Sequence, residues 1–353
     1  MMDTHSSPEA RSAEGTGHPS GHAVRVGGRT WTVPDFLRAL AAQLDDTPPH
    51  SVPFTSADLP ALDAFLGAGL PALRAHDEHH TWLEYRLRPP SRPRHELYGE
   101  LHTLVRELLD EGLLTHFYFV HKAQGIRVRF HVPPAHHAAT AGKLEEVWRG
   151  WERTGLISGL RHAVYEPEQH LFGGPAAMRW VHGVFTADSL FWLGHLRHEE
   201  PPVPLWRVSL SMIRTLLAEL GITEFEDRDV WDRLRWQAGR TFGSEEPAGW
   251  ARTSARINQV WNASDFLNSP RSWPQVGEDL TRFRDAVGRV CAAWRAEHLE
   301  RPGALVGPRE AAAFLVVFHW NRARMPRDWQ VGITEALAQG PSEEVVRATR
   351  TTG

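Results

Sequence analysis

The stretch HFYFVHKAQGIRVRFHVP, residues 116–133, decides the fold because it contains a complete β-hairpin. Apolar and polar residues alternate on both sides of Gln124 and Gly125, a pair typical of a tight turn. The pattern predicts two antiparallel strands, over 116–123 and 125–133.

The second predicted strand has two chemically different faces, because successive side chains of a strand point to opposite sides. One face is apolar and carries Ile126, Val128, Phe130 and Val132. The other face carries Arg127, Arg129 and His131. Such a strand is expected at the boundary between an apolar core and a polar surface or cleft.

The flanking segments extend the hairpin into a β-α-β-β-α-β order, which is that of a ferredoxin-like sheet. Alternation predicts further strands over 81–89 and 160–168, and amphipathic periodicity predicts helices over 96–112 and 136–155. We therefore expect an α+β fold in which the first and third strands are central neighbours. The helices should cover one face of the sheet and leave the other available.

Pairing of the two central strands would add residues of the first strand to the arginine-bearing face, namely Trp82, Glu84, Arg86 and Arg88. Two interpretations of this face stay open. It is either a solvated surface whose scattered ion pairs contribute little, or the cationic, partly aromatic floor of a binding cleft.

Beyond residue 174 the chain is predicted to be helical almost to its end. The expected helices, separated by prolines and glycines, span 175–198, 203–220, 227–242, 248–265, 275–298, 308–322 and 328–339. We expect them to form a C-terminal helical layer that packs on the open face of the sheet, leaving a peptide-binding cleft between the two.

Composition excludes several classes of protein. The net charge of −4 and the pI of about 6.6 provide no global basic field for nucleic acid. Apolar runs are too short to cross a bilayer, and the N-terminal segment lacks the apolar core of a secretory signal. We therefore expect a cytoplasmic protein without a membrane partner.

Cofactor and metal chemistry find little support in the sequence. Cys291 is the single cysteine, so an internal disulfide and a thiolate cluster are excluded, and its amphipathic surroundings favour buried filler over a nucleophile. The segment HDEHH (76–80) is expected to be an exposed polar loop rather than a metal site. Phosphate-loop and dinucleotide motifs are missing from the sequence, and we expect neither a cofactor nor a metal.

Three segments carry residues suited to chemistry. The first is the cationic face of the 125–133 strand, and the second is the turn with Tyr165, Glu166, Glu168 and His170. The third is the helix AAAFLVVFHWNRARM (311–325), in which Ala311, Leu315, His319 and Arg322 share one face. A helix this apolar must be mostly buried. Its His and Arg then need partners, and they are either structural or functional.

In their order and spacing, these motifs resemble the C-terminal, or elimination, domain of lantibiotic dehydratases, which also occurs alone as thiopeptide-type bacteriocin biosynthesis proteins. The motifs that carry the resemblance are WLEYRL (82–87), HFYFVHK (116–122), IRVRF (126–130), YEPEQHLFGGPAAM (165–178), FTADS (185–189) and FHWNR (318–322).

The resemblance implies an elimination-domain-like catalytic domain over 80–345. Residues 1–21 read as a disordered tail, and residues 22–75 as an extension with a hairpin and helices. Two interpretations of the extension remain: it helps to bind a leader peptide, or it is structural padding.

Elimination members of this family remove glutamate from glutamylated Ser or Thr with strand arginines, a turn arginine and a helical histidine. Position by position, the resemblance assigns Arg127, Arg129 and His319 to these roles. The turn arginine falls on Leu171, and the tyrosine after it falls on Phe172. Loss of one electrostatic contact to a developing oxyanion typically costs on the order of 100-fold in rate.

The other standalone branch of the family comprises the thiopeptide pyridine synthases, which act without a cofactor. They join two dehydroalanines of a modified peptide in a formal aza-[4+2] cycloaddition and release water and the leader peptide. On this prediction the catalytic candidates are His319, Glu168, His170 and Arg322. The substrate-binding candidates are Arg127, Arg129, Tyr165, Trp320 and Arg86.

Two alternatives accompany this prediction. One is a split-dehydratase subunit that eliminates glutamate with an altered pocket. The other is a non-catalytic subunit that binds the precursor peptide. In each case the expected partner is a ribosomally made precursor peptide, together with a dehydratase or other biosynthetic enzymes.

Overall fold

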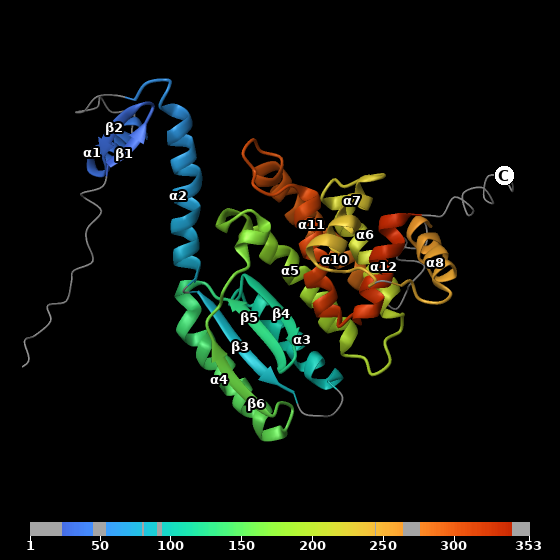
Figure 1. Ribbon diagram of the computed structural model, residues 1–353. Helices are drawn as coiled ribbons and strands as arrows, with labels where there is room; N and C mark the ends of the chain where they lie inside the picture. The colour runs from blue at the N-terminus through green and yellow to red at the C-terminus, as the bar shows by residue number, and fades with distance from the viewer. Residues whose placement is uncertain are drawn as a thin grey trace, which may run out of the picture. The chain divides into compact units, whose positions relative to one another are not determined.

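In the computed structural model, residues 23–44, 54–79, 81–89, 94–243, 245–263 and 276–340 are described. The chain divides into two compact units, Met1–Leu73 and Arg74–Gly353. The predicted tail over 1–21 lies outside the described residues. Figure 1 labels the elements of both units.

The first unit contains the predicted hairpin and its helices. Strands β1 (Ala23–Val26) and β2 (Arg29–Thr32) pair antiparallel, and helix α1 (Val33–Leu44) follows directly. Helix α2 (Leu59–His79) comes next and continues past the unit boundary. The expectation of a loop over 76–80 is therefore wrong for 76–79, because these residues form the last turn of α2. Residue 80 lies outside the described residues.

A small separate core holds the first unit together. Trp31 packs against Phe36 and Phe54, with ring centroids 6.5 Å and 5.1 Å away. Beside it, buried Asp58 accepts a hydrogen bond from the backbone N–H of Thr55 at 2.7 Å. The Thr55 bonds and the pairing with Arg29 together hold the pKa of Asp58 below its usual value.

The second unit contains a four-stranded antiparallel sheet. Its strands are β3 (Trp82–Arg88), β4 (His116–Lys122), β5 (Gly125–His131) and β6 (Gly159–Ala163), in the spatial order β4-β5-β3-β6. Strand β6 is shorter than the predicted 160–168 segment. Its pairing with β3 ends at Ala163, Val164 is exposed, and Pro167 has no N–H to donate to a ladder.

Helices α3 (His95–Asp110) and α4 (His137–Thr154) cover the apolar face of this sheet. Trp148 of α4 is fully buried against Tyr85 and Phe130, with ring centroids 5.5 Å and 6.1 Å away. On the same face, the Tyr98 hydroxyl of α3 lies 2.9 Å from His121 Nε2 of β4.

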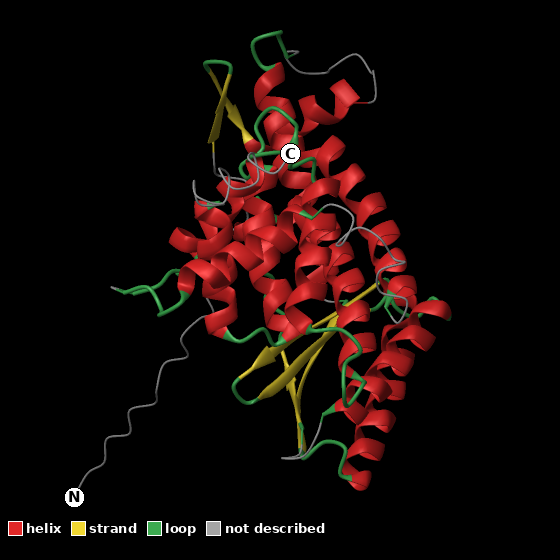
Figure 2. Cartoon of the chain, turned by 90° about the vertical axis from the view of Figure 1, so that its right-hand side faces the viewer, coloured by secondary structure: helices red, strands yellow, loops and turns green. Residues whose placement is uncertain are grey.

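The described residues after 174 form helices joined by loops, and Figure 2 shows these helices beside the strands. The helices are α5 (Pro175–Leu196), α6 (Leu205–Glu219), α7 (Glu226–Gln237), α8 (Trp250–Asn262), α10 (Gly277–Trp294), α11 (Pro308–Ala323) and α12 (Arg327–Gln339). A π-helical turn, Arg295–Leu299, extends α10.

The helical layer is attached mainly to the edge strand β4. Thr186 and Ser189 of α5 accept hydrogen bonds from the backbone N–H groups of Phe117 and Phe119, at 3.1 Å and 3.4 Å. The Asn321 side chain of α11 bonds both the N–H and the C=O of His121, at 2.7 Å and 2.9 Å. These contacts satisfy polar groups that an edge strand would otherwise expose.

Attachment at the edge leaves the polar face of the sheet only partly covered. Tyr118 lies under Phe185 of α5, with ring centroids 5.0 Å apart, so one end of the face is buried. At the other end Arg86 and Arg88 are exposed. The expectation that the C-terminal helices roof the whole face is therefore wrong, because α5 docks on β4 and covers only the nearby end.

Candidate functional site

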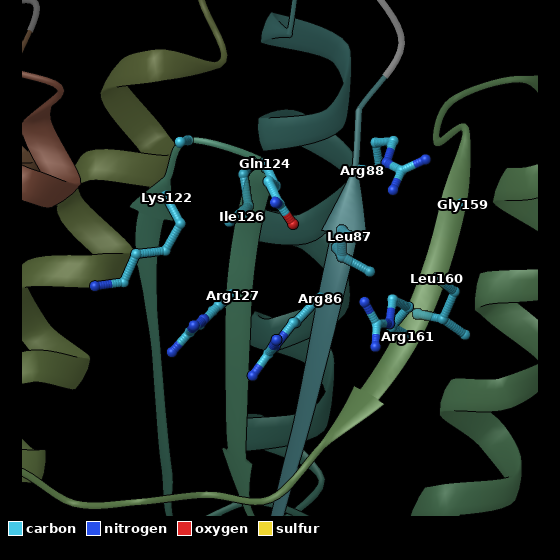
Figure 3. Close-up of a pocket in the computed structure, with 12 residues that line it drawn as sticks. Arg86, Leu87, Arg88, Lys122, Gln124, Ile126, Arg127, Gly159, Leu160 and Arg161 are labelled. Atoms are coloured by element: carbon cyan, nitrogen blue, oxygen red, sulfur yellow. The ribbon is translucent and has the colours of Figure 1, made fainter.

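The exposed end of the polar face forms a cationic pocket of about 570 Å³ (Figure 3). All four strands of the sheet supply cationic side chains to its lining, which are Arg86, Arg88, Lys122, Arg127 and Arg161. Of the predicted substrate-binding residues, Arg86 and Arg127 lie here, with side chains 45% and 31% exposed. The sequence prediction missed Arg161. This residue lies on the polar face because the register of β6 places it opposite Arg86 of β3.

The covered end of the same face contains a charge pair that water cannot reach. The guanidinium of Arg129 donates to Glu84 Oε2 at 2.7 Å and to the Tyr118 hydroxyl at 3.1 Å. The Arg129 and Glu84 side chains are 2% and 1% exposed. Burial alone would lower the pKa of Arg129, but Tyr118 and Glu84 outweigh it and the pKa is raised. Arg129 is therefore a fixed cation.

Aromatic residues complete this buried end. Arg129 lies over the rings of Tyr118 and Tyr165, 4.9 Å and 5.4 Å from their centroids. Burial raises the pKa of Tyr118 to about 12 and that of Tyr165 well above its usual value. The Tyr165 hydroxyl lies 2.6 Å from Nε2 of His182, whose pKa is well below its usual value because of burial. Both tyrosines are thus neutral hydrogen-bonding groups.

The turn that precedes α5 brings Glu168 to this end. Glu168 is half-buried, and its Oε2 atom is buried without a hydrogen-bond partner among the described residues. Its charge contributes to raising the pKa of Tyr165, which places it within electrostatic range of the tyrosines and Arg129. His170, two residues on, is exposed. The structure therefore separates the two predicted acid/base residues of the turn.

Gly173 and Gly174 give this turn a backbone that other residues rarely adopt, with φ angles of 89° and 106°. Leu171 is half-buried against the core, and Phe172 is fully buried between Phe185 and Phe318, at ring distances of 5.9 Å and 6.1 Å. The two positions where the resemblance places an arginine and a tyrosine therefore contribute apolar packing.

The predicted helical residues lie in a second, fully buried polar cluster between α5, α6 and α11. His319 Nδ1 lies 2.6 Å from Asp188 Oδ1, and its Nε2 lies 2.9 Å from Ser209 Oγ. Arg322 Nε donates to the other oxygen of Asp188. Burial would raise the pKa of Asp188, but His319 and Arg322 outweigh it and hold that pKa below its usual value. We call Asp188, Ser209, His319 and Arg322 the buried polar node.

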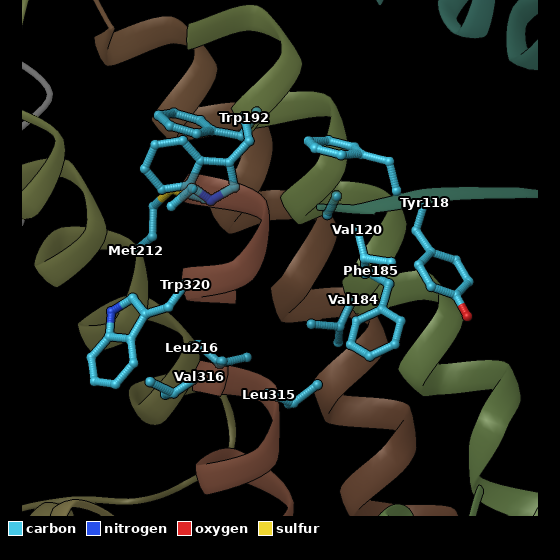
Figure 4. Close-up of a cluster of buried hydrophobic side chains, with 14 of the residues drawn as sticks. Tyr118, Val120, Val184, Phe185, Trp192, Met212, Leu216, Leu315, Val316 and Trp320 are labelled. Atoms are coloured by element: carbon cyan, nitrogen blue, oxygen red, sulfur yellow. The ribbon is translucent and has the colours of Figure 1, made fainter. Parts of the chain in front are cut away.

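The order Ser209, His319, Asp188 is that of a nucleophile relay, but burial argues against this chemistry. Ser209 is 0% exposed, and its hydroxyl accepts a hydrogen bond from Trp320 Nε1 at 3.2 Å. His319 and Arg322 are 4% and 1% exposed. Trp320, predicted to bind substrate, is fully buried in the apolar cluster around the node (Figure 4). The node therefore connects helices.

The described residues offer neither a metal site nor a membrane-spanning helix. Within the described ranges, no group of three or more His, Cys, Asp or Glu side chains could hold a metal ion. Over the same ranges, no helix combines the length and apolar character needed to cross a membrane. Cys291 is fully buried, and burial raises the pKa of its thiol to about 12.

Comparison with known proteins gives two matches. The sequence profile described as lantibiotic biosynthesis dehydratase C-term matches residues 82–339. The solved structure of the tRNA-dependent lantibiotic dehydratase MibB from Microbispora sp. 107891 is similar, with a TM-score of 0.55 and 21% sequence identity. The alignment covers 76% of this chain and 28% of the MibB chain, and at this identity it shows a shared fold. No curated protein sequence matches the chain.

Proposed function

Because this chain belongs to the lantibiotic biosynthesis dehydratase C-terminal family, we propose that it modifies a ribosomally made precursor peptide and acts as a pyridine synthase. Its reaction would be a formal aza-[4+2] cycloaddition between two dehydroalanines. Two carbon–carbon bonds form, and the ring becomes aromatic as water and the leader peptide leave. Holding the two alkenes together can supply about 7–11 kcal/mol of such a barrier.

The observation that favours cyclisation over glutamate elimination is the packing of the turn before α5. An eliminase of the family would use an arginine and a tyrosine where this chain has Leu171 and Phe172, and here both pack into apolar surroundings. A glutamyl ester would thus lose one of its cationic contacts. The node histidine, His319, is also buried and bonded on both nitrogens, which disfavours its use as an open general base.

The chemistry proposed for the covered end of the sheet is proton handling and hydrogen bonding. Cycloaddition requires the imidic-acid tautomer of one amide, so a carboxylate must accept an N–H proton while a donor holds the oxygen. Glu168 has an unpartnered oxygen for the first task. Arg129 is buried and paired with Glu84, so it would position Tyr118 and Tyr165 rather than contact the peptide. The partly exposed Arg127 on the same face would supply the donor.

The remaining predicted residues receive different roles in this proposal. His319 and Arg322 position α11 against α5 through Asp188 rather than contacting the peptide. His170 contacts peptide outside the covered end, since its side chain is exposed. Trp320 supports the node through its bond to Ser209.

Glutamate elimination remains the second candidate, because one observation favours it. The strand pair Arg127 and Arg129 and the helical His319, which the resemblance assigns to elimination, are all present. In that case Glu168 would be the base, and the cationic pocket would hold the glutamyl carboxylate.

The two candidates are separated by offering the purified protein two substrates and following products by mass spectrometry. The first is a leader-bearing peptide that already contains two dehydroalanines; the second is a glutamylated-serine peptide. The proposal expects a macrocycle and a detached leader from the first, without added cofactor. Conversion of the second into dehydroalanine, with the first left intact, would establish elimination instead.

A further inference from the structure

Three arginines form an unbroken row across the sheet at the cationic pocket. The β3–β5 register places Arg86 opposite Arg127, and the β3–β6 register places Arg86 opposite Arg161. Figure 3 shows their side chains next to one another on neighbouring strands. Like charges directly opposite one another destabilise a sheet, so this row needs compensation.

Among the described residues, a single carboxylate, that of Glu84, lies close enough to balance the positive charge of the three arginines. Glu84 lies 3.8 Å from Arg86 Nε and 3.9 Å from Arg127 Nε, but its other oxygen bonds Arg129 at 2.7 Å. Arg88, Lys122 and Arg161 form no ion pair with any residue that the structure describes. The twelve residues that line the pocket include five cations and no carboxylate.

The concentration of cations in the pocket is not a property of the chain as a whole. The protein as a whole has a net charge of −4, so the cations are concentrated rather than abundant. Some other exposed arginines of the same unit are paired with a carboxylate, as Arg309 is with Asp229 at 3.1 Å and Arg282 is with Asp279 at 2.9 Å. A bound anion would complete the pocket in the way that those carboxylates complete their pairs.

We propose that the cationic pocket binds an acidic segment of the peptide substrate, with several carboxylates contacting the arginine row. Guanidinium groups match carboxylates geometrically and donate paired, charge-assisted hydrogen bonds. Cations spread over four strands suit several separate carboxylates better than one small anion. The proposal rests on the proposed function for the identity of the ligand as substrate peptide.

This proposal implies the direction in which the bound peptide would run along the polar face. The acidic segment would lie over Arg86 and Arg161, and the peptide beyond it would continue along the face toward Arg129 and Glu168. The negative net charge of the protein disfavours nucleic acid as the ligand.

Binding can be measured without catalysis, which separates this inference from the proposed function. The probe is a short fluorescein-labelled peptide of alternating glutamate and leucine, followed by fluorescence anisotropy. Its glutamine analogue, free glutamate and a single-stranded oligonucleotide serve as competitors. We expect the probe to bind, its affinity to fall as salt is raised, and the glutamine analogue to fail as a competitor.

The double variant Arg88→Gln/Arg161→Gln should weaken probe binding at least tenfold. The matched control is Arg149→Gln/Arg153→Gln, which removes the same charge from exposed positions of α4, the helix that covers the opposite face. The control should bind as the unmodified protein does. A melting curve for each variant checks that it is folded.

Three results would overturn the inference. They are equal loss of binding in both double variants, unchanged binding in Arg88→Gln/Arg161→Gln, and displacement of the probe by the oligonucleotide at lower concentration than by unlabelled acidic peptide. Displacement by free glutamate at equal concentration would show a small-anion site and also contradict it. If the probe binds as expected and no cyclisation occurs, only the proposed reaction is wrong.

Discussion

The buried polar node and the cationic pocket use the same kinds of side chain for opposite purposes. In the node, Asp188 is shared by His319 and Arg322, and all three are 4% exposed or less. In the pocket, the cations outnumber the nearby carboxylates, and Arg86 is 45% exposed. The node is neutralised from within the chain, and the pocket is not.

The difference shows why a histidine or arginine motif does not by itself identify an active site. A buried charge persists only when partners replace its lost hydration, so the node's residues are required for the fold whether or not they act on substrate. An unneutralised row of exposed cations weakens the fold slightly and gains from a ligand. The following changes are expected to separate the two regions.

The largest effect should come from Asp188→Asn. It leaves the Arg322 guanidinium buried without its counter-charge, and loss of one partner of a buried pair typically costs about 3–5 kcal/mol. Urea unfolding should show this loss in the free energy of unfolding. Asp229→Asn is the control, because its pairs with Arg309 and Arg233 are half-exposed and contribute about 0–1 kcal/mol. Equal losses in the free energy of unfolding for the two variants would contradict the claim that the buried polar node stabilises the fold more than an exposed ion pair does.

Acid should destabilise the protein through its buried imidazoles. Burial lowers the pKa of His195 to about 4, and both ring nitrogens lack partners among the described residues. Between pH 6.5 and about 4 the unfolded chain therefore binds the proton and the folded chain does not. The free energy of unfolding falls as pH is lowered through this window, by up to roughly 3 kcal/mol for one such group.

His195→Phe tests the source of this acid sensitivity. The new ring can stack on Phe191 as the imidazole does, at a centroid distance of 6.1 Å in the present protein. The variant should be less sensitive to pH between 6.5 and 4, as measured by urea unfolding at a series of pH values. An unchanged slope would assign the sensitivity to other groups, such as His116 or His131, whose pKa values burial also lowers to about 4.

Leu171→Arg restores the charge that elimination members of the family use in this turn. Because Leu171 packs half-buried against the core, we expect a loss of about 1–3 kcal/mol in stability. Cyclisation should not improve, and glutamate elimination should stay absent in the mass-spectrometric assay. A gain of elimination activity in this variant would show that the pocket for glutamate is still in place.

The smallest effect should be opposite in sign. Arg161→Gln removes one end of the arginine row, so the free protein should gain about 0.2–1 kcal/mol in stability while losing affinity for the acidic probe. Differential scanning calorimetry, with and without the probe, measures both. Destabilisation of the free protein would mean that the row is already neutralised.

Local patterns were sufficient to predict most of the elements. Period-2 alternation in 116–133 placed the hairpin within one or two residues, and apolar periodicity found every described helix after residue 174. The predicted boundaries were wrong for two elements, the strand predicted over 160–168 and the helix that precedes the sheet. The strand at 160 ends at Ala163, before Leu83 and Trp82 of β3 are paired, and Pro167 a few residues on has no N–H to donate to a ladder. Helix α2 continues through a histidine-rich segment that was predicted to be a loop.

The site was less predictable, because its contacts join distant parts of the chain. Helical spacing indicated that His319 and Arg322 are buried, but their partner Asp188 lies 131 residues before His319. Nor could alternation show which part of the polar face α5 would cover, since that depends on the docking of Thr186 and Asn321 on the edge strand. Arg129 and Arg127, two residues apart, consequently lie in different environments.

Hydrogen–deuterium exchange, with and without the acidic glutamate–leucine peptide, tests most directly the claim that the open end of the sheet receives substrate. We predict slower exchange in 86–88, 122–127 and 159–161, and unchanged exchange in the helical segments around Asp188 and His319. Protection confined to residues 23–73, or to α11, would contradict this account.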